Sequence, residues 1–252
     1  MFPRALGIAR SLALYYGVPF RAQRLSRLYA PFVARGALCF DVGAHAGNRV
    51  RCFRRLGARV VAIEPQPDFV RVLQMLYGRD RAVAIVAAAV GRSPGEATLL
   101  ESRRTPTVTT LSAAWVDRVR TDPSFAGVSW SPGVRVPVTT LDALIAAHGM
   151  PAFVKIDVEG FEAEVLGGLS HAVAALSFEY LGVARDNAVA CVDRLARLGD
   201  YEYNWSRGET QRMAAPAWLE PDGMREVLRR LPGDGGSGDV YARLRDGRLA
   251  AA

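Results

Sequence analysis

Acidic side chains stand at the ends of several apolar stretches of this sequence, where buried β-strands are expected to finish. Asp41 closes the first such stretch and Glu64 the second, while Asp157 and Glu179 close later ones. The carboxyl ends of parallel strands meet at one edge of a sheet, where open α/β proteins bind their ligands. We therefore expect Asp41, Glu64 and Asp157 to surround one crevice. Carboxylates there could accept hydrogen bonds, take up a proton or hold a metal ion.

Two glycines follow Asp41 at a spacing that predicts a tight turn from a strand into a helix. Gly43 and Gly47 lack a β-carbon, so the backbone could approach a ligand closely there. The D-x-G-x-x-x-G pattern differs from the G-x-G-x-x-G of dinucleotide sites, where backbone amides hold a pyrophosphate. An acid before the glycines better suits a cationic or amine-bearing ligand such as S-adenosylmethionine (SAM). The alternative is a turn with only a structural role, as in any α/β protein.

Glu64 lies about twenty residues beyond the glycine turn, where Rossmann-type folds place the carboxylate that binds ribose hydroxyls. Its two oxygens match a vicinal diol, and the following Pro65 prevents the strand from continuing. The alternative is a solvent-exposed glutamate at the end of a strand. The spacing from the glycine turn favours the ribose.

Three charged residues alternate at the end of the strand expected over 151–156. Lys155, Asp157 and Glu159 would share one face because side chains of a strand alternate. Placing these charges together costs desolvation energy unless a ligand, a metal ion or the charges themselves compensate. Lys155 is the only lysine in a chain that otherwise uses arginine, which suggests that a compact ammonium is needed there.

The elements that must position these residues alternate between strands and helices, which predicts a parallel sheet with right-handed crossovers. A strand over 239–244 is expected to finish the sheet as an antiparallel edge pair with 201–205. The other expected strands are 37–42, 59–63, 82–90, 96–100, 134–138, 151–156 and 173–179.

Two segments stand apart from this alternation. Residues 1–36 contain six arginines and no acid, and they are expected to form a basic helical segment that caps the sheet, before a main domain over 37–252. Residues 101–133 are expected to form an irregular insertion. That insertion is either a lid over the site or a surface excursion anchored by Trp115 and Trp130.

The composition permits a large single domain and limits the choice of partner. The chain has 252 residues, a formal net charge of +7 and 50% hydrophobic residues. No basic run with interleaved aromatic residues predicts a nucleic-acid groove, and no apolar run is long enough to span a membrane. The widely spaced Cys39, Cys52 and Cys191 suit reduced thiols, so a cytoplasmic location is expected.

Five short motifs are spread over residues 37–182: they are 40–47, 62–67, 88–91 with Gly95, 138–142 and 155–162. With these motifs the chain resembles the FkbM-type SAM-dependent methyltransferases. The resemblance implies an α/β, Rossmann-like class I methyltransferase fold, with a seven-stranded, mostly parallel sheet, an antiparallel last strand and helices on both faces. It implies SAM contacts in the glycine turn and at the strand ends, namely Asp41, Gly43, Ala44, Gly47, Asn48, Glu64, Pro65 and Asp157.

The reaction implied by the resemblance is methyl transfer to a hydroxyl group of a small molecule, a sugar or a natural product. Candidate general bases are Asp157, Glu159, Glu179 and His45, which stands where the family more often has asparagine. Lys155 could keep the base ionised or stabilise a developing alkoxide. Asp157, Glu159 and Glu179 could also hold Mg²⁺, but pairing with Lys155 explains these acids without a metal.

Two other functions remain compatible with the sequence. One is a nicotinamide-dependent oxidoreductase on the same sheet plan, against which the missing G-x-G-x-x-G argues. The other is a non-catalytic basic module that binds nucleic acid or a membrane through residues 1–36.

Overall fold

The fold is described by a computed structural model, which covers residues 21–102, 105–208, 210–232 and 236–245 together with Gly7 and Gly17. The basic helical segment expected over 1–36 therefore lies outside the described residues up to position 20, apart from the two glycines. Its remainder contains helix α2 (Arg21–Tyr29).

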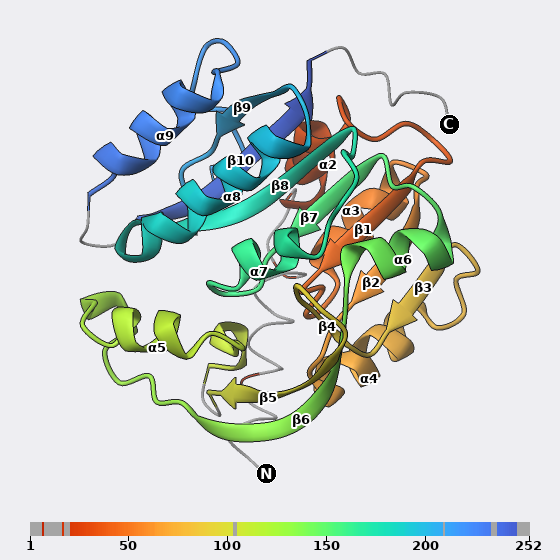
Figure 1. The fold of residues 1–252 in the computed structure, drawn as a ribbon. Helices are drawn as coiled ribbons and strands as arrows, with labels where there is room; N and C mark the ends of the chain where they lie inside the picture. The colour runs from red at the N-terminus through yellow and green to blue at the C-terminus, as the bar shows by residue number, and fades with distance from the viewer. Residues whose placement is uncertain are drawn as a thin grey trace.

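A seven-stranded sheet forms the centre of the molecule (Figure 1). In spatial order its strands are β3 (Val83–Val86), β2 (Arg59–Ile63), β1 (Leu38–Val42), β7 (Phe153–Ile156), β8 (Ala175–Leu181), β10 (Ser237–Leu244) and β9 (Tyr201–Trp205). The first five pair in parallel, whereas β10 runs antiparallel to both of its neighbours. This arrangement confirms the predicted class I methyltransferase fold. As expected, β10 and β9 form an antiparallel pair at the edge of the sheet, with β9 outermost and β10 between β8 and β9.

The apolar run 82–90 does not form the single strand that we expected. It divides into β3, which pairs with β2, and β4 (Ala89–Val90), which pairs with β6 (Ser131–Thr139) in a second sheet. That sheet has the order β4-β6-β5, with β5 spanning Gly95–Glu101. The break was hidden because a run of small apolar residues has no periodicity to mark it.

The insertion predicted to be irregular contains a short helix, α5 (Ala113–Val119), and two 3₁₀ turns, η1 (Pro106–Val108) and η2 (Pro123–Phe125). Helix α5 begins after Ser112, whose side chain accepts a hydrogen bond from the Trp115 backbone N–H at 3.1 Å. This N-cap was a readable helix signal in the sequence.

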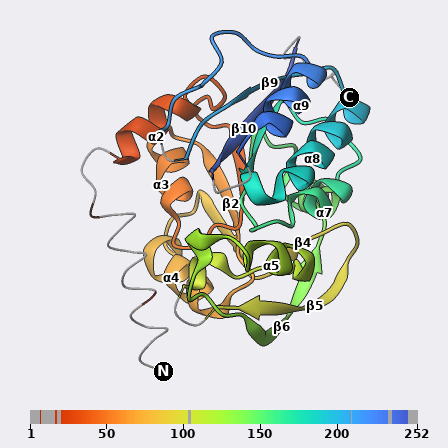
Figure 2. The same cartoon turned by 90° about the vertical axis from the view of Figure 1, so that its left-hand side faces the viewer.

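Helices cover both faces of the large sheet, as predicted (Figure 2). Alternate strand residues point to opposite faces, so Phe40 and Val42 belong to the core that includes residues of α6 to α9, whereas Cys39 belongs to the core that includes residues of α2 to α4. The remaining helices are α3 (Asn48–Arg55), α4 (Pro67–Tyr77), α6 (Leu141–His148), α7 (Glu162–Gly167), the 3₁₀ turn η3 (Gly182–Ala184), α8 (Arg185–Leu198) and α9 (Pro221–Arg230).

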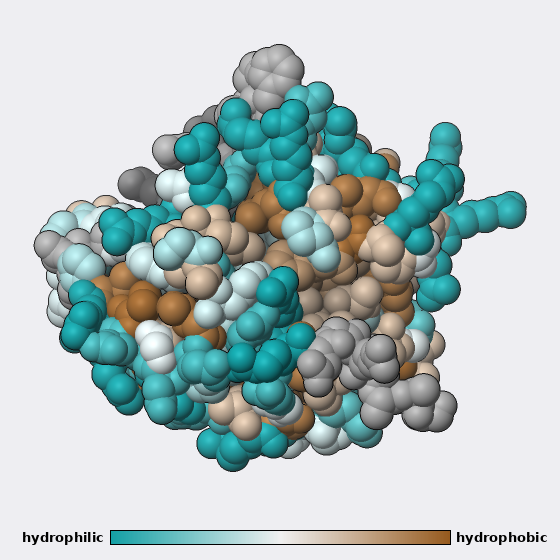
Figure 3. Space-filling model, turned by 90° about the horizontal axis from the view of Figure 1, so that it is seen from above, coloured by the Kyte–Doolittle hydropathy of each residue, from teal (hydrophilic) through white to brown (hydrophobic). Residues whose placement is uncertain are grey.

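The surface seen from above carries separate hydrophobic patches among hydrophilic side chains (Figure 3). Large exposed hydrophobic residues among those described are Met75, Leu76, Val134 and Met150. All three cysteines are buried and free. Within the described ranges, no helix has both the length and the apolar character needed to cross a bilayer.

Gly43 marks the point where the turn after β1 comes closest to the chain leaving β7. Its backbone is left-handed, with φ of +81°, and a β-carbon there would lie 1.9 Å from the carbonyl oxygen of Asp157. A residue with a side chain would therefore have to move one of the two segments that carry the predicted site.

Replacing Gly43 with alanine is expected to lower the free energy of unfolding by at least twice as much as replacing Gly36. Gly36 has the same backbone conformation, with φ of +82°, but a β-carbon at that position would have no heavy atom within 4 Å. Gly36→Ala should therefore cost only the left-handed strain, about 1–2 kcal/mol. Urea unfolding of both variants measures the difference, and equal losses would contradict the close approach at Gly43.

Candidate active site

A cleft opens at the carboxyl ends of β1, β2 and β7, where the sequence places its acids. It contains about 920 Å³ of empty space including its open mouth, within the range of small-molecule sites. Ala44 and Gly47 belong to the adjoining turn without lining the cleft, and Lys155 is fully buried. The predicted residues that line the cleft are Asp41, Gly43, His45, Asn48, Glu64, Pro65, Asp157 and Glu159.

The glycine turn ties the end of β1 to the end of β2. The N–H groups of Gly43 and Ala44 both donate to the carbonyl of Ile63, at 3.0 Å each, and the Gly47 N–H donates to the Ala44 carbonyl at 2.8 Å. Gly47 then precedes α3 in a left-handed conformation. The turn therefore has the structural role considered as an alternative, and it also forms one wall of the cleft.

Glu64 is held in a fixed orientation by the backbone around it. Its Oε2 accepts from the His45 N–H and its Oε1 from the Gln66 N–H, both at 2.8 Å. The side chain is 2% exposed. Burial raises the pKa of the Glu64 carboxyl to about 7, although the two backbone hydrogen bonds counteract this. Each oxygen keeps a further lone pair, so the carboxylate could accept two hydroxyls of a ligand.

Asp41 offers a second acceptor in the cleft. The side chain is 1% exposed, and its Oδ2 has no hydrogen-bond partner among the described residues. Burial raises the pKa of the Asp41 carboxyl to about 7, against the opposing effect of the positive charges of Arg49 and Lys155. A buried acceptor without a partner is costly, and a ligand that donates a hydrogen bond would remove this cost.

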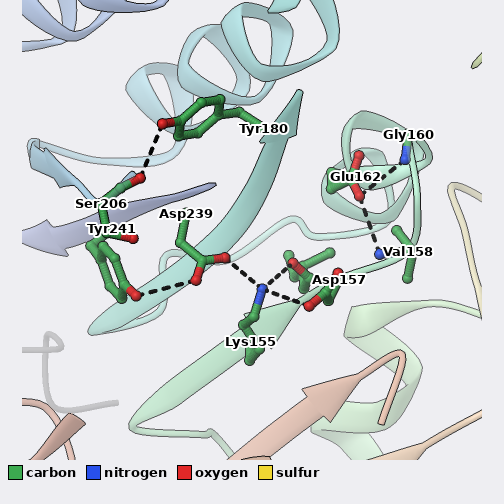
Figure 4. Close-up of polar contacts among 10 residues, drawn as sticks. Lys155, Asp157, Val158, Gly160, Glu162, Tyr180, Ser206, Asp239 and Tyr241 are labelled. Carbon is green, nitrogen blue, oxygen red and sulfur yellow. Dashed lines mark hydrogen bonds and ion pairs between the residues drawn. The ribbon is translucent and has the colours of Figure 1, made fainter. Parts of the chain in front are cut away.

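Lys155 pairs with two aspartates (Figure 4). Its Nζ lies 2.8 Å from Oδ1 of Asp239 and 3.2 Å from Oδ2 of Asp157. Tyr241 in turn donates to Oδ2 of Asp239 at 3.3 Å. Burial acts to lower the pKa of Lys155, but the two carboxylates outweigh it and raise the pKa above its usual value. Lys155 therefore stays charged and fixes the direction of Asp157.

Asp157, Glu159 and Glu179 converge, as the sequence predicted. One oxygen from each carboxylate lies within 4.8 Å of the others. Burial, together with the neighbouring carboxylates, raises the pKa of both Glu159 and Glu179 well above the usual range. Such acids can relieve their repulsion by holding protons, and hard divalent cations also suit oxygen ligands.

Glu162 organises the loop that carries these acids, a role that we did not predict. Its Oε1 accepts from the N–H groups of Val158 and Gly160, at 3.1 and 3.2 Å (Figure 4). Its Oε2 accepts from Asn187 Nδ2 at 2.5 Å. The side chain is 1% exposed. An acid in the first turn of a helix was the sequence signal for such a role.

The insertion packs against this loop. The Trp115 ring lies so close to Gly160 that a β-carbon there would sit 2.1 Å from it. Thr110 Oγ1 donates to the Glu159 carbonyl at 2.7 Å. Trp115 also makes an edge contact with Trp130, at 5.9 Å between ring centres. The tryptophans are thus packed anchors, while Thr107, Thr109 and Thr110 line the cleft.

His45 lines the cleft in a setting that disfavours proton transfer. Its ring lies against Phe69, with 3.6 Å between ring centres. Burial lowers the pKa of His45 to about 3, so the imidazole is neutral and a weak base. Its backbone N–H, by contrast, holds Glu64. The structure therefore favours a positioning role for His45 over the predicted general-base role.

The sequence matches the methyltransferase FkbM domain over residues 41–203. No curated protein matches the sequence. Among solved structures, precorrin-6y C5,15-methyltransferase from Geobacter metallireducens is 12% identical with a TM-score of 0.46, covering 89% of this chain and 86% of its own. An O-methyltransferase from Bacillus cereus in complex with SAH is 12% identical with a TM-score of 0.42, and the match covers 96% of this chain and 88% of the Bacillus protein.

The structural similarities are too distant to indicate a substrate. The domain match, however, spans more than half of the chain and includes Asp41, Glu64 and Asp157. The chain therefore belongs to the FkbM family of methyltransferases.

Proposed function

We propose that the protein transfers a methyl group from SAM to a hydroxyl oxygen of a small molecule or a glycan. The charge of the cleft supports this proposal: among the described residues that line it, four are acids and one, Arg49, is a strong base. The whole chain, in contrast, has a formal net charge of +7. SAM carries two positive charges, on its sulfonium and its ammonium, and one negative charge, on its carboxylate. A pyrophosphate or a nucleic-acid backbone would meet repulsion in the same cleft.

The cleft offers partners for the polar groups of the ribose and of the methionine part of SAM. Glu64 has lone pairs for the two ribose hydroxyls. Asp41 has an unpartnered buried oxygen for the methionyl ammonium, and Arg49, which lines the same cleft, has the charge required for the methionyl carboxylate. Bound SAM would supply an electrophilic methyl group, and the protein would align the acceptor oxygen with it, which can be worth about 7–11 kcal/mol.

The acceptor hydroxyl must lose its proton, and Asp157 and Glu159 are the best-placed acids to take it. Both line the cleft. Lys155 fixes the Asp157 carboxylate at 3.2 Å. Burial and the neighbouring carboxylates raise the pKa of Glu159 well above its usual range, which makes its carboxylate a stronger base once it is ionised. Glu179 lies beside both acids but does not line the cleft, and Mg²⁺ at this cluster is not required by the proposal.

Titration calorimetry is expected to show binding of SAM and no binding of NAD⁺. The physical reason is the excess of acids in the cleft, which attracts a cation and repels a pyrophosphate. Incubation of the protein with labelled SAM and a small-molecule extract, followed by mass analysis, would identify the acceptor. Binding of NAD⁺ without SAM would favour the oxidoreductase. Salt-dependent binding of RNA or anionic vesicles without SAM would favour the non-catalytic module.

Asp157→Asn is expected to reduce methyl transfer by about 10²–10⁴-fold, the usual contribution of a positioned base. SAM affinity should change much less, because Lys155 keeps Asp239 as its partner. Turnover of the identified acceptor and calorimetry with SAM measure the two effects separately. Asp222→Asn, at a 96% exposed side chain on α9, serves as the control. If Asp157→Asn leaves both turnover and binding intact, Asp157 is not catalytic.

SAM binding is expected to weaken as the pH falls below 7. Asp41 and Glu64 both have pKa values of about 7 and must be ionised to hold the ammonium and the ribose. Each lost pH unit should reduce the affinity by up to about tenfold per carboxyl that must release a proton.

The stability of the protein without SAM is expected to depend on pH in the opposite direction. Folding favours the protonated carboxyls, so the free energy of unfolding should fall as the pH rises from about 4 through 7.

Calorimetry at pH 5.5, 7.0 and 8.5 measures the pH dependence of SAM affinity, and urea unfolding at the same pH values measures the pH dependence of stability without SAM. Glu64→Gln should bind SAM less tightly and with a flatter pH dependence, because one titrating group is gone. An affinity that stays constant over this pH range would contradict the assignment of these two acids.

A further inference from the structure

Gln66 is a buried polar side chain of the cleft that the proposed reaction has not yet used. It follows Glu64 by two positions and precedes the first residue of α4. The side chain is 5% exposed and lines the cleft. Its Oε1 is buried without a hydrogen-bond partner among the residues that the structure describes. A buried carbonyl of this kind is costly unless a ligand donates to it.

The other end of the Gln66 amide is anchored. Its Nε2 donates to the Pro106 carbonyl at 3.3 Å, in the insertion, and its backbone N–H donates to Glu64 at 2.8 Å. Rotation of the amide by half a turn would set two carbonyl oxygens against each other at Pro106. The amide of this cleft-lining side chain therefore keeps its unpartnered acceptor and cannot readily exchange it for a donor.

Gln66 extends a series of acceptors along the cleft. Asp41 stands at the end of β1, Glu64 at the end of the neighbouring β2, and Gln66 further along the chain at the start of α4. SAM carries its hydrogen-bond donors in the same order: the methionyl ammonium, the ribose hydroxyls and the 6-amino group of adenine. Two of these donors already have partners in the proposed function.

We propose that Gln66 Oε1 accepts a hydrogen bond from the 6-amino group of adenine and thereby selects adenine over a 6-oxo purine. This inference rests on the proposed binding of SAM and adds the residue that reads the base. A 6-oxo group would place an acceptor opposite the Gln66 carbonyl, and neither could rotate away. Sites built to hydrogen-bond a ligand group reject the analogue that lacks it.

The test compares two ligands that differ at this position, S-adenosylhomocysteine and S-inosylhomocysteine, by titration calorimetry. The wild-type protein is expected to bind the adenosyl compound at least about tenfold more tightly. Gln66→Met, of similar length but without polar atoms, should reduce this preference to about twofold or less. Gln74→Met, at an exposed position on α4, should keep the full preference.

The outcomes distinguish a failure of the proposed role of Gln66 from a failure of the proposed SAM binding. If the wild-type protein binds both compounds equally, or if Gln66→Met keeps the full preference, the role of Gln66 is wrong while SAM binding stands. If the wild-type protein binds neither compound, the proposed function fails as well. If Gln66→Met does not fold, as judged by circular dichroism, Gln66→Leu, which also removes the acceptor, takes its place in the comparison.

Discussion

A buried ammonium between two aspartates holds the active edge of the sheet together. Lys155 comes from β7 and Asp239 from β10, and β8 runs between these two strands. An ammonium removed from water costs several kcal/mol unless its partners are well placed, and loss of one partner is strongly destabilising. The pair therefore resists any shift of one strand against the other. Asp157, the second partner, takes its direction from this contact, so the geometry of the cleft depends on it.

Much of the architecture was predictable because parallel strands impose simple rules. The acids Asp41, Glu64 and Asp157 each follow an apolar run, and the shared edge of a parallel sheet brought all three into one cleft. The mistakes came from segments with weak patterns. The alanine-rich run 82–90 shows no period that separates β3 from β4, and α5 is only seven residues long.

Two of the site residues that sequence reasoning missed, Asp239 and Gln66, act through long-range contacts. Asp239 lies 84 positions from Lys155, and only the insertion of β10 beside β8 brings them together. Gln66 meets Pro106 across 40 positions. Glu162 was part of a recognised motif, but its role in holding Val158 and Gly160 depends on how the chain turns before α7. The partners of Asp239 and Gln66 cannot be read from local spacing.

The position of β10 between β8 and β9 affects how the protein is made. A nascent chain that has released β8 and β9 cannot yet join them, because the strand that separates them is still inside the ribosome. Lys155 then has one aspartate instead of two, and the edge of β8 lacks its neighbour. Such unpaired edges attract other chains. The sheet at this edge is therefore complete only after β10 has followed β8 and β9 out of the ribosome and has entered between them.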